Sequence, residues 1–195
     1  MMNELVQANR SYRRFDETRP VGMKQLESWV RNARYAASAM NAQPLRYILC
    51  TEERTNAAVF PLTKWAGYLT DWDGPAPGER PTAYVVVLHD TEVKVKPEFV
   101  WCDMGLASQN ILLSAREEGF AGCMVASVAW DRLRETLSID GRYEPLLVIA
   151  LGAPAEEVHL VDVGADGSIK YYHDEAGAHY VPKREMEDLI IGRRG

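Results

Sequence analysis

Apolar positions along the chain follow two spacings, one typical of helices and one typical of buried strands. Residues 82–89, TAYVVVLH, form a continuous run of β-branched, aromatic and aliphatic residues, as in a strand that is buried on both faces. Residues 99–118 carry apolar or small side chains at helical spacing and are followed by Gly119, which predicts the longest helix. Shorter patterns predict helices at 4–9, 23–37, 64–69, 130–137 and 183–191, strands at 47–51 and 146–151, and an apolar segment at 121–127.

Two further stretches are less regular. Residues 71–81, DWDGPAPGERP, are rich in proline and glycine and predict a surface loop. Residues 158–163 and 169–172 flank a DGS turn, which suggests a peripheral hairpin. The elements together predict an α+β or mixed α/β fold in one domain spanning 1–195, with the strand order left open.

Composition narrows the class of protein. The chain has 195 residues and a net charge of −6, which argues against nonspecific nucleic-acid binding, since that needs a broad basic surface. Its three cysteines and four histidines show no C-x-x-C or H-E-x-x-H spacing, so no disulfide framework or metal site is expected. No signal peptide and no run long enough to span a membrane is recognised. We therefore expect a cytoplasmic protein without a membrane or nucleic-acid partner.

The first candidate site is the basic cluster NRSYRRF at residues 9–15. Arginine side chains bind phosphate or carboxylate oxygens in pairs, and a serine hydroxyl with nearby backbone N–H groups completes a phosphate site. Arg10, Ser11 and Arg13 are the candidate anion ligands. Taken alone, the cluster is explained better as a solvated basic helix face.

Three more segments carry possible ligand-binding groups. Ser38, Asn41 and Gln43 in SAMNAQPLRY suit a heterocycle with donors and acceptors, although capping and turn formation would also explain them. The small residues of GFAGCMVAS, 119–127, permit close backbone approach, or form a tight helix-to-strand turn. Lys183 and Arg184 at a predicted helix start oppose the helix dipole, which suggests an anionic partner, with solvent exposure as the alternative.

No arrangement of a nucleophile with a base is recognised. Asp103 and the pair at 117–118 are interpreted as surface or capping charges, and neither the dinucleotide-binding G-x-G-x-x-G nor a P-loop occurs. If the protein is an enzyme, a bound cofactor is therefore expected to carry the reactive chemistry.

These motifs, in this order, resemble the nitroreductase family of FMN-dependent oxidoreductases. The resemblance rests on RSYRRF, SAMNAQP, ERPTAYVVVLHD, DMGLASQNILLSAREEGFAGC and HYVPKREMEDLIIG, and covers nearly the whole chain. It implies a nitroreductase-like α+β fold with a central, mostly antiparallel sheet flanked by helices. It also implies an intertwined homodimer with two FMN sites at the subunit interface.

The resemblance implies roles for individual residues. Arg10 and Ser11 bind the phosphate, and Tyr12 also belongs to the cofactor site. Arg13 reaches the pyrimidine edge of the flavin, where positive charge stabilises the reduced anion. Lys64 is also placed near the pyrimidine, and Lys183 and Arg184 close over the phosphate. Ser38, Asn41 and Gln43 come from the partner subunit. The segment along the flavin ring comprises Cys123, Met124, Val125 and Ala126.

The activity implied is hydride transfer from NADH or NADPH through FMN to a small electron-poor acceptor, such as a nitroaromatic compound, a quinone or an activated alkene. One shared site predicts ping-pong kinetics. Trp65, Tyr68 and Trp72, near the substrate-side loop 71–81, are expected to cover the substrate pocket or to form a subunit interface. Met124 stands where the family often has tryptophan. This difference changes the face on which substrates stack, so the resemblance does not identify the substrate. Alternatives are a non-catalytic flavin-binding protein and a specialised flavin reaction such as reductive dehalogenation.

Overall fold

The computed structural model describes residues 1–69 and 71–195. The chain divides into two compact units, one made of residues 1–65 and 73–155 and the other of residues 66–72 and 156–195. The first unit contains the strands and helices predicted to form the core. The second contains three short strands and the C-terminal segment, and whether 1–195 acts as one flavin-binding domain stays a prediction.

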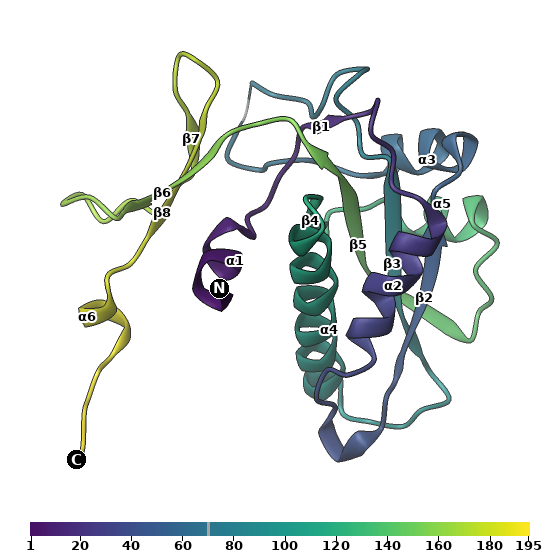
Figure 1. Ribbon diagram of the computed structural model, residues 1–195. Helices are drawn as coiled ribbons and strands as arrows, with labels where there is room; N and C mark the ends of the chain where they lie inside the picture. The colour runs from purple at the N-terminus through teal and green to yellow at the C-terminus, as the bar shows by residue number, and fades with distance from the viewer. Residues whose placement is uncertain (70) are drawn as a thin grey trace. The chain divides into compact units, whose positions relative to one another are not determined.

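An antiparallel sheet of five strands forms the centre of the first unit (Figure 1). Its order is β1-β5-β3-β2, and β4 also pairs with β5. The long central strand β5 therefore pairs with β1, β3 and β4, and β2 is attached through β3. The bounds are β1 Phe15–Asp16, β2 Leu45–Cys50, β3 Ala83–Asp90, β4 Ala121–Val125 and β5 Tyr143–Pro154. The predicted α+β class with a mostly antiparallel sheet is confirmed.

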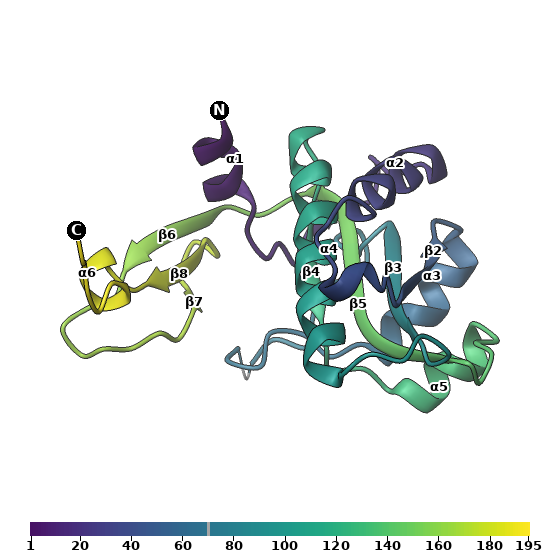
Figure 2. The same ribbon diagram turned by 90° about the horizontal axis from the view of Figure 1, so that it is seen from below.

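Helices α2 (Met23–Ala33) and α4 (Pro97–Glu117) cover one face of this sheet, as Figures 1 and 2 show from two sides. The stripe predicted for the long helix is confirmed, because Val100, Ala107 and Ile111 are buried in the main core. The other helices of this unit are α1 Met2–Ala8, α3 Glu53–Val59 and α5 Trp130–Thr136, with short 3₁₀ turns η1 Ala39–Asn41 and η2 Phe60–Leu62.

Strand β3 is buried on both faces, as its continuous apolar run predicts. Val85 and Val87 belong to the core under α2 and α4. Tyr84 and Val86, which alternate with them, are also fully buried, so the opposite face is covered as well.

The helix expected at 64–69 is not formed, and α3 and η2 occupy the preceding residues instead. Thr63 forms a bridge to Val128, and the Lys64 N–H donates to the Ser127 carbonyl at 2.9 Å. These backbone groups are therefore used for pairing with the segment after β4. The described residues that follow form a turn.

The second unit contains β6 (Val158–Asp162), β7 (Tyr172–His173), β8 (His179–Lys183) and α6 (Met186–Leu189). The hairpin expected between 158–163 and 169–172 was wrong, because β6 pairs with β8 in parallel and β7 pairs with β8 in antiparallel orientation. The tight turn lies later, where the Asp174 side chain accepts from the Ala178 N–H at 2.9 Å and Gly177 has a φ of 85°. This local side-chain bond and the glycine close the β7–β8 hairpin.

The long C-terminal helix predicted at 183–191 is also not formed. Lys183 ends β8, Pro182 pairs with Val161 in the sheet, and α6 covers only four residues. The basic pair therefore lies before the helix and does not oppose its dipole. In the part of the chain that the structure describes, no helix has the length and apolar character needed to cross a membrane.

Candidate functional site

The N-terminal arginine segment lies directly beside β4. Ser11 forms a parallel bridge with Gly122, and the Tyr12 N–H donates to the Gly122 carbonyl at 3.1 Å. On the other side of Gly122, an added Cβ would lie 2.5 Å from the Ala150 carbonyl oxygen of β5. Only glycine allows the backbone to fit between these two neighbours. Ser11 and Tyr12 are therefore held against Gly122 in β4.

The arginines in this segment are held in different ways. Arg10 donates from Nη2 to the Val6 carbonyl at 2.9 Å, while its Nε is buried without a hydrogen-bond partner among the described residues. Burial lowers the pKa of Arg10. Arg13 donates to the Ser11 carbonyl at 3.4 Å. Arg14 lies 3.7 Å from the Glu79 carboxylate, with which it forms an ion pair.

Side chains of β4 and the residue after it alternate between the protein interior and the surface. Cys123 and Val125 are buried, whereas Met124 and Ala126 are exposed, because successive side chains of a strand point to opposite faces. The exposed side chain of Lys64 comes from the segment that pairs with residues 127–128. Basic groups from two segments therefore lie next to β4 and its C-terminal continuation.

The second predicted group, Ser38, Asn41 and Gln43, lies in a loop with unusual backbone geometry. Met40, Asn41 and Gln43 have φ values of 54°, 52° and 48°. Residues other than glycine seldom adopt this left-handed conformation. Such outliers persist only where surrounding contacts hold them, and they are often found at functional sites.

Asp103 of α4 supplies the contacts that hold this loop. Its carboxylate accepts hydrogen bonds from the Ser38 hydroxyl and from the Ala39 N–H, and the Ser38 Oγ accepts from the Gln43 N–H at 3.0 Å. Asp103 is 5% exposed, so its interpretation as a surface or helix-capping charge was wrong. The reason is that the loop folds back onto α4, which the spacing within α4 does not reveal.

A cavity of about 150 Å³ lies beside these groups. Burial, with a smaller contribution from the Asp103 charge, raises the pKa of the neighbouring Tyr47 to about 12. Its phenol is therefore a neutral hydrogen-bonding group at ordinary pH. The lining residues include Ala33, Ser38, Gln43, Tyr47, Asp103 and Ala107.

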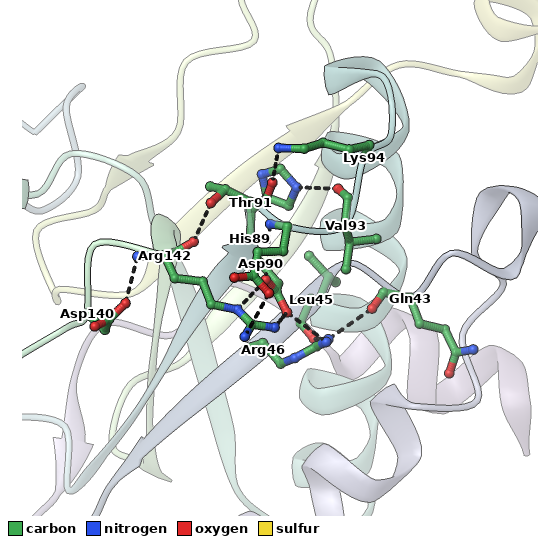
Figure 3. A network of polar contacts seen from close by, with 11 residues as sticks. Gln43, Leu45, Arg46, His89, Asp90, Thr91, Val93, Lys94, Asp140 and Arg142 are labelled. Carbon is green, nitrogen blue, oxygen red and sulfur yellow. Dashed lines mark hydrogen bonds and ion pairs between the residues drawn. The ribbon is translucent and has the colours of Figure 1, made fainter.

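A network of charges fixes the far end of the loop (Figure 3). Arg46 donates to the carbonyls of Gln43 at 3.0 Å and Leu45 at 2.8 Å, and lies 2.9 Å from the Asp90 carboxylate. Asp90 is fully buried and accepts two hydrogen bonds from Arg142, at 2.8 and 2.7 Å. The Arg142 hydrogen bonds, the Glu92 N–H and the two cationic charges together lower the Asp90 pKa to about 2.

Sequence reasoning missed this network. The available signal was an aspartate at the end of the strongly apolar strand β3, a position where a buried carboxylate needs a cationic partner. Arg142 is 52 positions from Asp90, so no local pattern identifies it.

The two groups of predicted residues lie toward opposite ends of α4. The Arg116 guanidinium lies over the Tyr12 ring, 5.6 Å from its centre, whereas Ser38 contacts Asp103. Arg116 follows Asp103 by 13 positions, which corresponds to roughly 20 Å of helix at about 1.5 Å per residue. Within one chain the arginine segment and the 38–43 loop are therefore well separated.

The remaining predicted residues are distributed over both units. Trp65 in the first unit is 8% exposed and packs near Phe60, with ring centres 6.1 Å apart. In the second unit, Tyr68 packs near Tyr171 at 5.0 Å and Trp72 near His173 at 6.2 Å. Lys183 and Arg184, also in the second unit, are exposed at the end of β8. Their predicted roles in binding cofactor or substrate stay predictions.

Comparison with known proteins gives a consistent result. The Nitroreductase family model matches residues 6–153, which include α2 to α5 and all of the five-stranded sheet except its last residue, Pro154. A Bacillus subtilis strain 168 protein, YdgI, whose assigned name is that of an NAD(P)H nitroreductase, is 22% identical over 185 residues. This match covers 79% of the present chain and 88% of YdgI.

Solved structures show the same fold. A nitroreductase family protein from Streptococcus pneumoniae TIGR4 matches with a TM-score of 0.73 at 16% identity, over 100% of both chains. An Exiguobacterium sibiricum 255-15 protein solved in complex with FMN has a TM-score of 0.67 at 19% identity, covering 80% of this chain and 89% of its own. An FMN-dependent nitroreductase of Clostridium difficile R20291 has a TM-score of 0.63 at 21% identity, with coverages of 80% and 89%.

Proposed function

The chain belongs to the nitroreductase family, and from this premise we propose that it is an FMN-dependent oxidoreductase. It takes hydride from NADH or NADPH and transfers it to a small electron-poor acceptor such as a nitroaromatic compound, a quinone or an activated alkene. The matched proteins named as an NAD(P)H nitroreductase and as an FMN-dependent nitroreductase support this chemistry.

The residues beside β4 fit FMN. The observation that carries the proposal is Arg10, whose buried Nε has no partner among the described residues, next to the Ser11 hydroxyl. A buried charged donor costs free energy unless an acceptor satisfies it, and a phosphate oxygen is such an acceptor. The outer edge of β4 adds backbone N–H groups and the exposed Met124 and Ala126 side chains, which suit a flat heterocycle.

When bound, FMN supplies the redox chemistry, because its ring can accept hydride from one molecule and give it to another. Arg10 and Ser11 hold the phosphate and so fix the position of the ring. Arg13 and Lys64 place positive charge where negative charge develops during the reaction, which lowers the barrier through electrostatic stabilisation. No side-chain nucleophile is required. Donor and acceptor share one face of the site, and this sharing leads to ping-pong kinetics.

Ser38, Asn41 and Gln43 act in this site from a second copy of the chain. Roughly 20 Å of α4 separates their loop from the arginine segment within one chain, at about 1.5 Å per residue, so one FMN does not bridge the two groups. A homodimer in which the loop of one copy meets the β4 edge of the other resolves this separation. Lys183 and Arg184 are included as further phosphate ligands from the family resemblance alone.

Spectroscopy of the purified full chain tests the cofactor and the activity together. We expect a yellow protein whose flavin absorbance is bleached within seconds when NADH or NADPH is mixed with it anaerobically in a stopped-flow instrument. Flavin absorbance that returns when a quinone is added shows that the reduced flavin passes its electrons on. Steady-state kinetics that indicate no ternary complex of enzyme, nucleotide and quinone support the shared site. Colourless protein that takes up no added FMN contradicts the proposal, and a yellow protein that neither nucleotide reduces favours the non-catalytic flavin-binding alternative.

Mixing two variants with weakened FMN binding tests the shared site. Arg13→Ala and Gln43→Ala homodimers are each expected to retain less flavin than the wild type, but a mixed dimer of the two contains one site with neither substitution. Co-expression with different affinity tags should therefore recover flavin in about half of the sites of the mixed dimer. Recovery of none indicates that both residues act within the same chain.

A further inference from the structure

The second unit brings together three groups that bind metal ions in many proteins. A carboxylate oxygen of Glu156 and one ring nitrogen each of His173 and His179 all lie within 4.8 Å of one another. The His173 Nε2 is 3.1 Å from the His179 Nδ1. All three residues belong to the same compact unit. The cluster plays no part in the flavin chemistry proposed above.

Strand register explains why these residues meet. His173 of β7 is directly opposite His179 of β8, and the Asp174–Ala178 turn bond joins the two strands. On the other side of β8, the His179 N–H donates to the Glu157 carbonyl at 2.9 Å, and Val158 is opposite His179. Glu156, two residues before β6, therefore lies next to the histidine pair. The arrangement is set by backbone pairing.

The surroundings of the cluster restrict its freedom. His179 is 1% exposed, while Glu156 and His173 are partly buried. The Tyr171 ring stacks on His179 with centres 5.3 Å apart, and the Trp72 ring lies edge-on to His173 at 6.2 Å. Side chains held in this way lose little additional conformational freedom when they bind an ion.

We propose that Glu156, His173 and His179 form a binding site for a divalent transition-metal ion of the zinc type. Two neutral imidazoles and a carboxylate are a usual ligand set for zinc. Ligands bonded tetrahedrally at about 2.0–2.1 Å lie about 3.3 Å apart, close to the separation of the two histidine nitrogens. A Glu156 carboxylate oxygen lies within 4.8 Å of a ring nitrogen of each histidine.

The role that follows is structural. An ion bound by β7, β8 and the segment that leads into β6 connects all three strands of the small sheet, which contains few fully buried apolar side chains. Binding would therefore stabilise this unit, because an ion that binds only the folded form shifts the equilibrium toward it. It would also fix β8, whose last residue is Lys183.

Titration of the full, untagged protein with zinc tests the site. After treatment with a chelator and its removal, isothermal titration calorimetry and elemental analysis should give one zinc ion per chain. Glu156→Gln, which keeps the size of the side chain, and His173→Ala should each weaken zinc binding by at least about tenfold. Limited proteolysis should show that zinc protects residues 156–195 in the wild type and protects them less in both variants.

His159→Ala is the matched control. His159 lies in the same unit, is exposed, and is 3.4 Å from the exposed Glu157 carboxylate, so it forms a similar acid–histidine pair outside the cluster. It should bind zinc like the wild type. Wild-type protein that binds no zinc, or equal losses in His159→Ala and Glu156→Gln, would overturn the assignment. Flavin content, measured in parallel, reports separately on the proposed oxidoreductase function.

Discussion

The arginine segment at residues 10–13 and the loop at residues 38–43 are predicted to bind the same cofactor, but they are held in place by different means. The arginine segment is attached by backbone pairing to Gly122 of β4. The 38–43 loop is held by side chains, chiefly Asp103 on one side and Arg46 with Asp90 on the other. The position of the arginine segment should therefore depend on the close backbone contact at Gly122. The position of the 38–43 loop should depend on the charged side chains and the hydroxyl that hold it.

This difference follows from where the segments lie. Backbone pairing is available at the edge of the sheet, where β4 has an open side for Ser11. The loop follows α2 and has left-handed backbone conformations at Met40, Asn41 and Gln43, which regular pairing does not stabilise. Charged side chains can hold such a conformation because they make strong hydrogen bonds to irregular backbone.

Gly122→Ala should have the largest effect, and it should affect the arginine segment. The new Cβ would lie 2.5 Å from the Ala150 carbonyl and 2.8 Å from side-chain atoms of Leu112 and Leu151. The backbone must shift, so we expect a loss of about 3 kcal/mol in the free energy of unfolding, together with loss of FMN. Urea denaturation and flavin content measure the two effects.

Gly141→Ala provides the control, since no heavy atom lies within 4 Å of a Cβ at that position. It should change the free energy of unfolding by less than about 0.5 kcal/mol. Similar losses in the two variants would show that the close contact at Gly122 is not the cause.

Asp90→Asn should have the next largest effect and should act on the loop. It leaves Arg46 and Arg142 without their shared carboxylate. Because the Asp90 pKa is lowered from 3.8 to about 2 in the folded protein, its stabilising contribution is complete above pH 3.8 and is lost as the pH falls toward 2. The stability difference between wild type and variant should therefore shrink over this range in acid denaturation measurements. A difference that stays constant from neutral pH to pH 2 would contradict the assignment.

Ser38→Ala tests the other attachment of the loop. It removes the hydroxyl that donates to the buried Asp103 carboxylate and accepts from the Gln43 N–H. A hydrogen bond to a charged group contributes about 1.5–3 kcal/mol, and we expect a loss of this size in urea denaturation. Ser28→Ala, on the exposed side of α2, should be nearly neutral. A Ser38→Ala protein as stable as Ser28→Ala would remove the proposed support for the loop.

Arg13→Ala should have the smallest effect on stability among these substitutions, and it should weaken cofactor binding where Arg14→Ala does not. Arg13 is the proposed pyrimidine ligand, whereas Arg14 is directed to Glu79. We expect Arg13→Ala to weaken FMN binding about tenfold, which corresponds to about 1.4 kcal/mol, and to slow reduction by NADH. Arg14→Ala should leave both unchanged. Fluorescence titration with FMN measures the affinities, and equal behaviour of the two variants would contradict the division of roles.

The sequence by itself determined the elements that depend on local pattern. Strand β3 and helix α4 were predicted close to their observed bounds, because a continuous apolar run and a 3.6-residue stripe report burial directly. The ordered motifs also identified the family and led to the proposed site segments at 10–13, 38–43 and 123–126, because the resemblance depends on residue identity and order. Their meeting in one site still depends on strand pairing and, as proposed, on a second chain.

The tertiary structure alone decided the features whose partners are distant in sequence. Asp103 looks like a helix surface residue until the 38–43 loop folds onto it. Strand β6 pairs with β8 and not with the nearer segment at 169–172. Spacing gave no indication of a metal site among the four histidines, yet strand register sets His173 beside His179. Backbone pairing and charge pairing act between residues far apart in the chain, so their partners become known only when the chain is folded.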